Sequence, residues 1–98
     1  MDRISITVAE LRQAADEVLR HLEEIEGETI HFEKDLFWAI PHEQKWNPYT
    51  QPNEFTVGQL SECVDNIKRA LRRPDQHVSY ELVWLAEILG AAGSQTVR

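Results

Sequence analysis

Apolar residues in the first third of the chain recur at helical spacing. They follow one another at steps of three and four positions: Val8, Leu11, Ala15, Val18, Leu22 and Ile25. Charged residues fill many of the positions between them, which is the pattern of a helix with one apolar stripe. Thr7 and Glu10 have the spacing of a capping box, and Gly27 stands where a helix often ends. We therefore expect a helix over residues 8–26.

The segment that follows alternates between apolar and polar residues. Ile30 and Phe32 fall on one side with polar residues between them, which is typical of a half-buried strand. A second apolar run returns after a turn, so we expect a hairpin with strands 28–33 and 36–40. Because an isolated hairpin is only marginally stable in water, it must pack against the helices or pair with another chain.

Residues 41–55 show no periodicity and contain three prolines. A loop of this length in a small domain is usually either functional or a misread secondary-structure element. Thr56 and Gln59 then form another capping-box pattern, which predicts a helix over 57–72. Its apolar residues again follow three- and four-residue steps: Val57, Leu60, Val64, Ile67 and Leu71. Pro74 is expected to end it.

The last predicted helix covers residues 79–92, with Ser79 as its cap. Its apolar residues occur nearly all the way round, and only Glu81 and Glu87 interrupt them. A helix of this kind is buried against several neighbours or against a partner. We expect the chain end, residues 94–98, to be a disordered tail.

Together these elements predict an α+β fold. It has a three-helix core (about 8–26, 57–72 and 79–92), a short β-hairpin and a long aromatic-rich loop. A chain of 98 residues has the length of one domain, so residues 1–93 are expected to form a single globular domain.

The net charge of −7 is unevenly distributed. Residues 1–35 carry ten acidic and four basic side chains, whereas residues 36–74 carry four acidic and five basic ones. The acidic first third favours a basic partner protein and disfavours nucleic acid. The basic side chains near residue 72 are favoured at a helix C-terminus by the helix dipole. The helix predicted over 79–92 contains no basic side chain with which to bind in a DNA major groove. We expect no nucleic-acid partner.

The chain also lacks the signals of secretion and of membrane insertion. It has one cysteine, Cys63, so it cannot form an intrachain disulfide, and its N-terminus does not resemble a signal peptide. No apolar stretch approaches the roughly 18 residues of a membrane span. These features predict a cytoplasmic protein with no membrane partner.

The sequence contains no motif that names a reaction. Paired histidines at metal-binding spacing, a CxxC pair and a glycine-rich phosphate loop are all missing. His31, Glu33 and Asp35 would share one face of a strand and could chelate a cation, but such a triplet is more typical of a solvated strand face. Cys63 is best interpreted as a buried, inert thiol. We expect no catalytic residue, no metal site and no cofactor, which favours a non-enzymatic protein.

Aromatic residues cluster in and around the loop. Five rings fall within nineteen residues: Phe37, Trp38, Trp46, Tyr49 and Phe55. Two interpretations stay open, namely rings that plug one end of the core and rings that form a recognition surface. For the second, the candidate partner-binding residues are Trp38, His42, Glu43, Trp46, Tyr49 and Phe55.

Two hypotheses of function follow. The first is a protein-interaction module, such as a small acidic inhibitor, an immunity-type protein or a regulatory subunit, which binds a basic protein. Its partner could also be a second copy in a homodimer, because the last helix has more apolar surface than one neighbour can cover. The alternative is a small-molecule or metal-binding protein, including an enzyme, with the loop 37–55 as pocket rim. Its polar candidates are His31, Glu33, His42, Glu43 and Tyr49.

Overall fold

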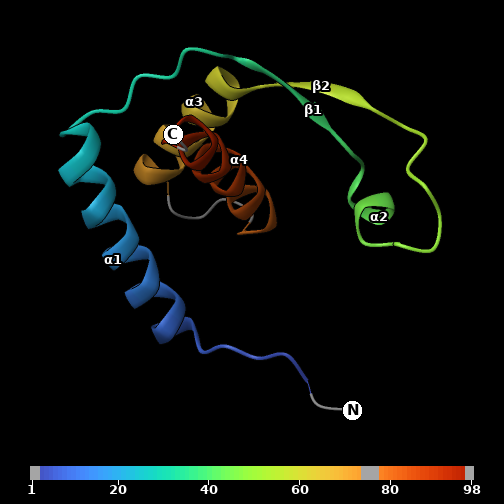
Figure 1. Cartoon of the computed structure of the whole chain (residues 1–98), viewed down its shortest axis with the longest axis horizontal. Helices are drawn as coiled ribbons and strands as arrows, with labels where there is room; N and C mark the ends of the chain where they lie inside the picture. The colour runs from blue at the N-terminus through green and yellow to red at the C-terminus, as the bar shows by residue number, and fades with distance from the viewer. Residues whose placement is uncertain (1–2, 74–77, 97–98) are drawn as a thin grey trace. The chain divides into compact units, whose positions relative to one another are not determined.

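The chain is described from a computed structural model, which places residues 3–73 and 78–96. Along the chain its elements are α1 (Val8–Glu26), β1 (Leu36–Ala39), α2 (His42–Lys45), β2 (Thr56–Gln59), α3 (Leu60–Arg72) and α4 (Val78–Thr96) (Figure 1). This combination of helices and an antiparallel strand pair confirms the predicted α+β class. The structure divides into two compact units, Met1–His31 and Phe32–Arg98, each of which is described by itself. A single globular domain over 1–93 stays a prediction.

The helix α1 has the bounds that the apolar stripe predicts. The Thr7 backbone N–H donates to the Glu10 carboxylate at 3.1 Å, and the Glu10 N–H donates to the Thr7 hydroxyl at 3.0 Å. The hydrogen bonds from Thr7 lower the pKa of Glu10, because they favour the charged carboxylate. Gly27, at φ 85°, ends the helix and donates to the Glu23 carbonyl at 2.8 Å. The predicted capping box and the predicted C-terminal glycine are both confirmed.

The strand pairing differs from the prediction. The second predicted strand exists as β1, but residues 28–33 do not form a strand. β1 instead pairs antiparallel with β2, in a register that places Leu36 opposite Gln59 and Ala39 opposite Thr56. Ile30 and Phe32 are half-buried, so the alternation correctly indicated their burial. Alternation cannot show whether a neighbouring strand is present, and β1 finds its partner about twenty residues further along the chain.

Gly58 explains why β2 fits against β1. Phe37 lies opposite Gly58 in the register, and a Cβ atom built at Gly58 would overlap the Phe37 ring. A glycine in a strand often marks such a close approach. The Phe37 ring therefore lies against the backbone of β2 at Gly58.

The helix α3 begins at Leu60, three residues later than expected, because residues 56–59 belong to β2. The predicted Thr56 capping box is therefore wrong, and the observed N-cap, Gln59, makes no side-chain capping bond. The cap comes from Asp35, whose carboxylate accepts from the Ser61 N–H at 2.7 Å and from the Ser61 hydroxyl at 3.1 Å. The Asp35 carbonyl also accepts from the Leu60 N–H at 2.7 Å. α3 ends at Arg72, as expected, and Pro74 lies outside the described residues.

The helix α4 is longer than expected. It covers Val78–Thr96, so Ser79 lies inside the helix, and residues 94–96, predicted as part of a disordered tail, are helical. Residues 97–98 lie outside the described residues. α4 packs against α3, and the buried residues of the described structure are Leu60 and Cys63 from α3 and Ala92 from α4. Ala92 is buried near the end of α4, which is consistent with a helix that continues past residue 92, where it was predicted to end.

A bond near the chain end ties α4 to the segment that enters the hairpin. The Gln95 side-chain oxygen accepts from the Glu33 N–H at 3.3 Å. Residues 33–35 are therefore held by α4 on one side and by α3 on the other. Within residues 3–73 and 78–96, no helix combines the length and the apolar character needed to cross a membrane.

The observed cap of α3, Asp35, and the capping box predicted at Thr56 lead to different expectations for the stability of two variants. Asp35→Ala removes the side-chain acceptor for the Ser61 N–H and hydroxyl, so we expect it to lower the free energy of unfolding by about 1 kcal/mol. Thr56→Ala should have a smaller effect, because the Thr56 hydroxyl caps no helix and donates one long hydrogen bond, at 3.4 Å, to the Ala39 carbonyl. Urea denaturation followed by circular dichroism measures both changes.

Asp65→Ala is the matched control, because it removes an exposed carboxylate from the middle of α3. Its free energy of unfolding should stay unchanged or rise slightly, since alanine favours helix. A larger loss for Thr56→Ala than for Asp35→Ala would contradict the long-range cap.

Candidate functional site

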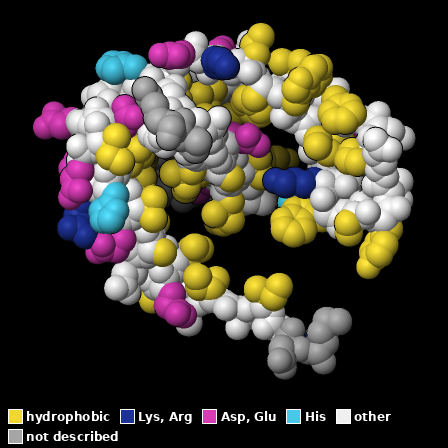
Figure 2. Space-filling model, viewed as in Figure 1, with side chains coloured by type: hydrophobic (Ala, Val, Ile, Leu, Met, Phe, Trp, Pro, Cys, Tyr) yellow, Lys and Arg dark blue, Asp and Glu magenta, His cyan; other side chains and the backbone are white. Residues whose placement is uncertain are grey.

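An apolar patch covers one face of the β1–β2 pair. Because side chains alternate along a strand, Leu36 and Trp38 of β1 share this face with Val57 of β2, which pairs with Trp38. Phe55, which precedes β2, joins them. These four side chains are here called the hairpin patch. Leu36 is 63% exposed, Trp38 is 74% exposed, and Val57 and Phe55 are each 56% exposed. Figure 2 shows hydrophobic side chains gathered over this part of the chain.

Two rings of the hairpin patch are in direct contact. Trp38 and Phe55 meet edge to face, with ring centroids 6.2 Å apart and an interplanar angle of 77°. Such a pair contributes about 0.5–1.5 kcal/mol beyond the apolar area that it buries. The contact orders both side chains before any partner arrives, which lowers the entropy that binding must offset.

The loop between the strands is more ordered than its sequence suggests. The one-turn helix α2 follows Pro41, and His42 and Trp46 lie near each other, with ring centroids 6.3 Å apart. The Gln44 side-chain oxygen accepts from the backbone N–H groups of Asn53 and Glu54 at 3.0 and 3.2 Å. Gln44 thereby joins the two ends of the loop, just before Phe55.

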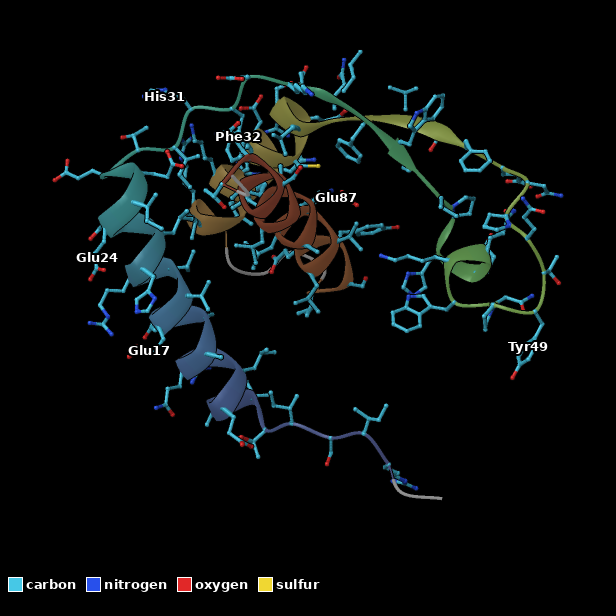
Figure 3. The ribbon with its side chains drawn as sticks, in the orientation of Figure 1. Glu17, Glu24, His31, Phe32, Tyr49 and Glu87 are labelled. Atoms are coloured by element: carbon cyan, nitrogen blue, oxygen red, sulfur yellow. The ribbon has the colours of Figure 1, made fainter. Side chains whose placement is uncertain are left out.

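The structure brings together some of the predicted partner-binding residues and separates others. Trp38 and Phe55 form one pair, and His42 and Trp46 form another. Tyr49 is 95% exposed and lies at the outer turn of the loop, where its ring points away from it (Figure 3). Glu43 is exposed on α2. Of the five rings, Phe37 is half-buried, so it fits the interpretation as a core plug, and the other four are exposed.

Sequence reasoning missed Leu36 and Val57 as members of the site. Val57 fitted the apolar stripe of the helix predicted over 57–72, and that assignment hid its place on a strand face. The signal was present in Thr56-Val57, because two adjacent β-branched residues favour a strand. Placing residues 56–59 on a strand would have put Leu36, Trp38, Phe55 and Val57 on one surface.

The hairpin patch carries no charge, and the segment around it carries little. Residues 36–59 contain Glu43, Lys45 and Glu54 as their charged side chains, apart from His42. The acidic residues concentrate instead on α1 and in residues 28–35 (Figure 2). Contact at the patch itself would therefore gain free energy from apolar burial rather than from ion pairs.

A metal site at His31, Glu33 and Asp35 would require a strand on which these three side chains share one face. Residues 28–33 are no strand, and the Asp35 carboxylate is bonded to Ser61 of α3. Among the described residues, no group of three or more histidine, cysteine, aspartate or glutamate side chains is placed to hold a metal ion.

Cys63 sits between α3 and α4 in a setting that disfavours the thiolate. Its side chain is 9% exposed. Burial raises the pKa of the Cys63 thiol above its ordinary value of 9.0, and the negative charges of Glu87, Glu62 and Asp35 raise it further. Because the thiolate is the nucleophile, a raised pKa and a buried sulfur support the interpretation of an inert core residue.

Comparison with known proteins identifies no relative, since no family model, curated protein or solved structure matches the chain significantly.

Because folding raises the pKa of Cys63, the free energy of unfolding should fall at alkaline pH. The folded state holds this proton more tightly than the unfolded chain, so the stabilisation is complete below pH 9.0 and is lost as the pH rises through the folded pKa. Cys63→Ala removes the titrating group. The free energy of unfolding, measured by urea denaturation between neutral and alkaline pH, should fall more steeply for the natural chain than for this variant.

The comparison uses the slope against pH, because the substitution also changes packing at every pH. All other titrating groups are common to both chains, and Cys63→Ser supplies a second variant of similar size. Parallel curves for all three chains would show that Cys63 is not held in a buried, proton-favouring site.

Proposed function

We propose that this chain is a non-enzymatic protein-interaction module that binds a partner protein through the hairpin patch. The observation that supports this most directly is the exposure of Leu36, Trp38, Phe55 and Val57 on one face of a fixed strand pair. Together they present on the order of 400–500 Å² of apolar surface, which is near the size of the largest patches on soluble monomers. Patches of this size are often functional.

The chemistry of the hairpin patch suits a protein partner. Tryptophan is enriched at the energetic centres of protein interfaces, and Trp38 lies in the patch with Phe55 packed against its ring. The outlying residues Trp46 and Tyr49 extend the exposed aromatic surface along the loop. They would form the rim of the contact, where single side chains contribute less.

The charge of the chain favours a basic partner. The net charge is −7, and most of the excess acid lies in residues 1–35. Opposite charge accelerates encounter, while the uncharged hairpin patch would supply the lasting contact. This division of roles fits a small acidic inhibitor, an immunity-type protein or a regulatory subunit, each bound to a basic protein.

A second copy of the chain is the other partner that the exposed apolar surface favours. Two-fold association covers the same patch on both copies and needs no other protein. A role in binding a small molecule or a metal, with the loop 37–55 as pocket rim, stays a prediction that no contact among the described residues specifically favours.

The proposal is tested by binding with and without Trp38. The tagged full chain should retain a stoichiometric protein from an extract of its native host at low salt. Trp38→Ala, which removes the central ring of the patch, should weaken binding of that protein at least about tenfold, as expected of an interface hot spot. Isothermal calorimetry with the purified partner measures the loss, and a faster association at low salt would support a basic partner.

Leu71→Ala is the matched control, because Leu71 is an exposed apolar residue of α3 outside the hairpin patch. It should bind like the natural chain, and circular dichroism should show that both variants are folded at the temperature of the binding measurement. Failure to retain any stoichiometric partner, or equal binding by the Trp38 and Leu71 variants, would overturn the proposal.

A further inference from the structure

The outer edge of β1 carries backbone groups that face away from β2. The Leu60 N–H donates to the Asp35 carbonyl, so these two residues are a hydrogen-bonded pair at the start of the ladder. Every second residue of an antiparallel strand then turns its N–H and C=O groups away from the neighbouring strand. On β1 these residues are Leu36 and Trp38. Within residues 3–73 and 78–96 the sheet has two strands, so β1 is an edge strand (Figure 1).

The sequence of β1 does not protect this edge from pairing. Edge strands are commonly blunted by a charged side chain, a proline or a bulge, which discourages the addition of another strand. Residues 36–39 contain neither a charge nor a proline, and their register with β2 has no inserted residue. A two-stranded sheet is also marginally stable by itself, and a third strand would stabilise it. The edge is therefore suited to accept an extended segment.

The edge of β1 is better placed for this than the edge of β2. Leu36 and Trp38, which turn their backbone groups outward, also contribute their side chains to the hairpin patch. A strand added beside them would bring its own side chains within about 5 Å of theirs, so backbone pairing and apolar burial would occur in one contact. On β2 the outward residues are Val57 and Gln59, and α3 begins directly after Gln59.

The chemistry of the edge limits what can occupy it. Only an extended segment can pair with the outward groups, because a helix uses its backbone N–H and C=O groups internally. The exposed apolar surface favours either a partner protein or a second copy of the chain. The net charge of −7 distinguishes the two, because a second copy carries the same charge, whereas a basic protein is attracted.

Taking the hairpin patch as the binding surface of the proposed function, on which this inference rests, we propose that the partner adds a third strand to the outer edge of β1. The added segment belongs to a basic protein and is extended. Its backbone bonds to Leu36 and Trp38 supply affinity, as in other cases of strand addition. Apolar side chains at alternate positions of the segment continue the apolar face of the hairpin patch and supply specificity.

Amide hydrogen exchange of the free full chain, resolved by residue, tests whether the edge is open. The Phe37 and Ala39 amides face β2 and should be protected, whereas the Leu36 and Trp38 amides should exchange rapidly. On addition of the protein that the tagged chain retains, the Leu36 and Trp38 amides should become protected as well. Protection of both in the free chain would overturn the proposal, because a second copy or another segment would already occupy the edge.

A pair of substitutions at Leu36 separates backbone pairing from side-chain burial. Leu36→Ala and Leu36→Pro both remove the leucine side chain, but only proline removes the outward N–H, and it breaks no bond to β2. By isothermal calorimetry, the retained protein should bind Leu36→Pro at least about tenfold more weakly than Leu36→Ala, because one of its carbonyl groups loses its hydrogen bond in a buried contact. Circular dichroism should show that both variants are folded.

Val57→Pro and Val57→Ala are the matched controls, because they make the same two changes at an outward residue of β2. These two variants should bind the retained protein equally. If Trp38→Ala weakens binding but Leu36→Pro and Leu36→Ala bind equally, strand addition is wrong and the proposed function stands. A larger difference within the Val57 pair than within the Leu36 pair would also overturn the proposal. Failure to retain any stoichiometric partner would overturn the proposed function and strand addition together.

Discussion

The hydrogen bonds that Asp35 accepts from Leu60 and Ser61, at the start of α3, are the interaction on which the rest of the site depends. A strand pair of this size is marginally stable by itself, and β1–β2 extends away from the residues that are buried between α3 and α4. Asp35 stands immediately before β1, and through Leu60 and Ser61 it fixes the open end of the hairpin to a helix that is itself packed. Glu33 adds a bond to Gln95 of α4. The Trp38–Phe55 pair therefore lies on a strand pair whose open end is hydrogen-bonded to α3 and α4.

A second constraint is how few apolar residues the unit Phe32–Arg98 buries. In the part of the chain that the structure describes, Leu60, Cys63 and Ala92 are the buried apolar residues, although 42% of the sequence is hydrophobic. The exposed apolar residues of the unit Phe32–Arg98 are grouped, with Leu36, Trp38, Phe55 and Val57 together in the hairpin patch. Grouped exposure of this kind is typical of surfaces that are covered in an assembly, whereas scattered exposure needs no explanation. The proposed function follows from this grouping.

The sequence predicted those features that depend on neighbouring residues and failed where distant segments decide. The stripe from Val8 to Ile25 and the Thr7 capping box are local, and both are confirmed. The strand pairing was wrong because nothing near residues 28–33 shows that β1 pairs with β2 instead. The start of α3 was wrong for the same reason, since its cap, Asp35, is 26 residues away from Ser61. At the candidate site, Trp38 and Phe55 could be named from composition, whereas Leu36 and Val57 become part of it only through that pairing.

The central claim is that the hairpin patch is preformed because Asp35 joins the strand pair to α3. Amide hydrogen exchange, resolved by residue and compared between the natural chain and Asp35→Ala, tests this most directly. The account predicts that the Ser61 amide and the β1–β2 ladder amides are protected in the natural chain. It also predicts that the substitution accelerates exchange at both places together and leaves α1 unchanged. Unprotected ladder amides in the natural chain, or faster exchange at Ser61 alone, would contradict the claim.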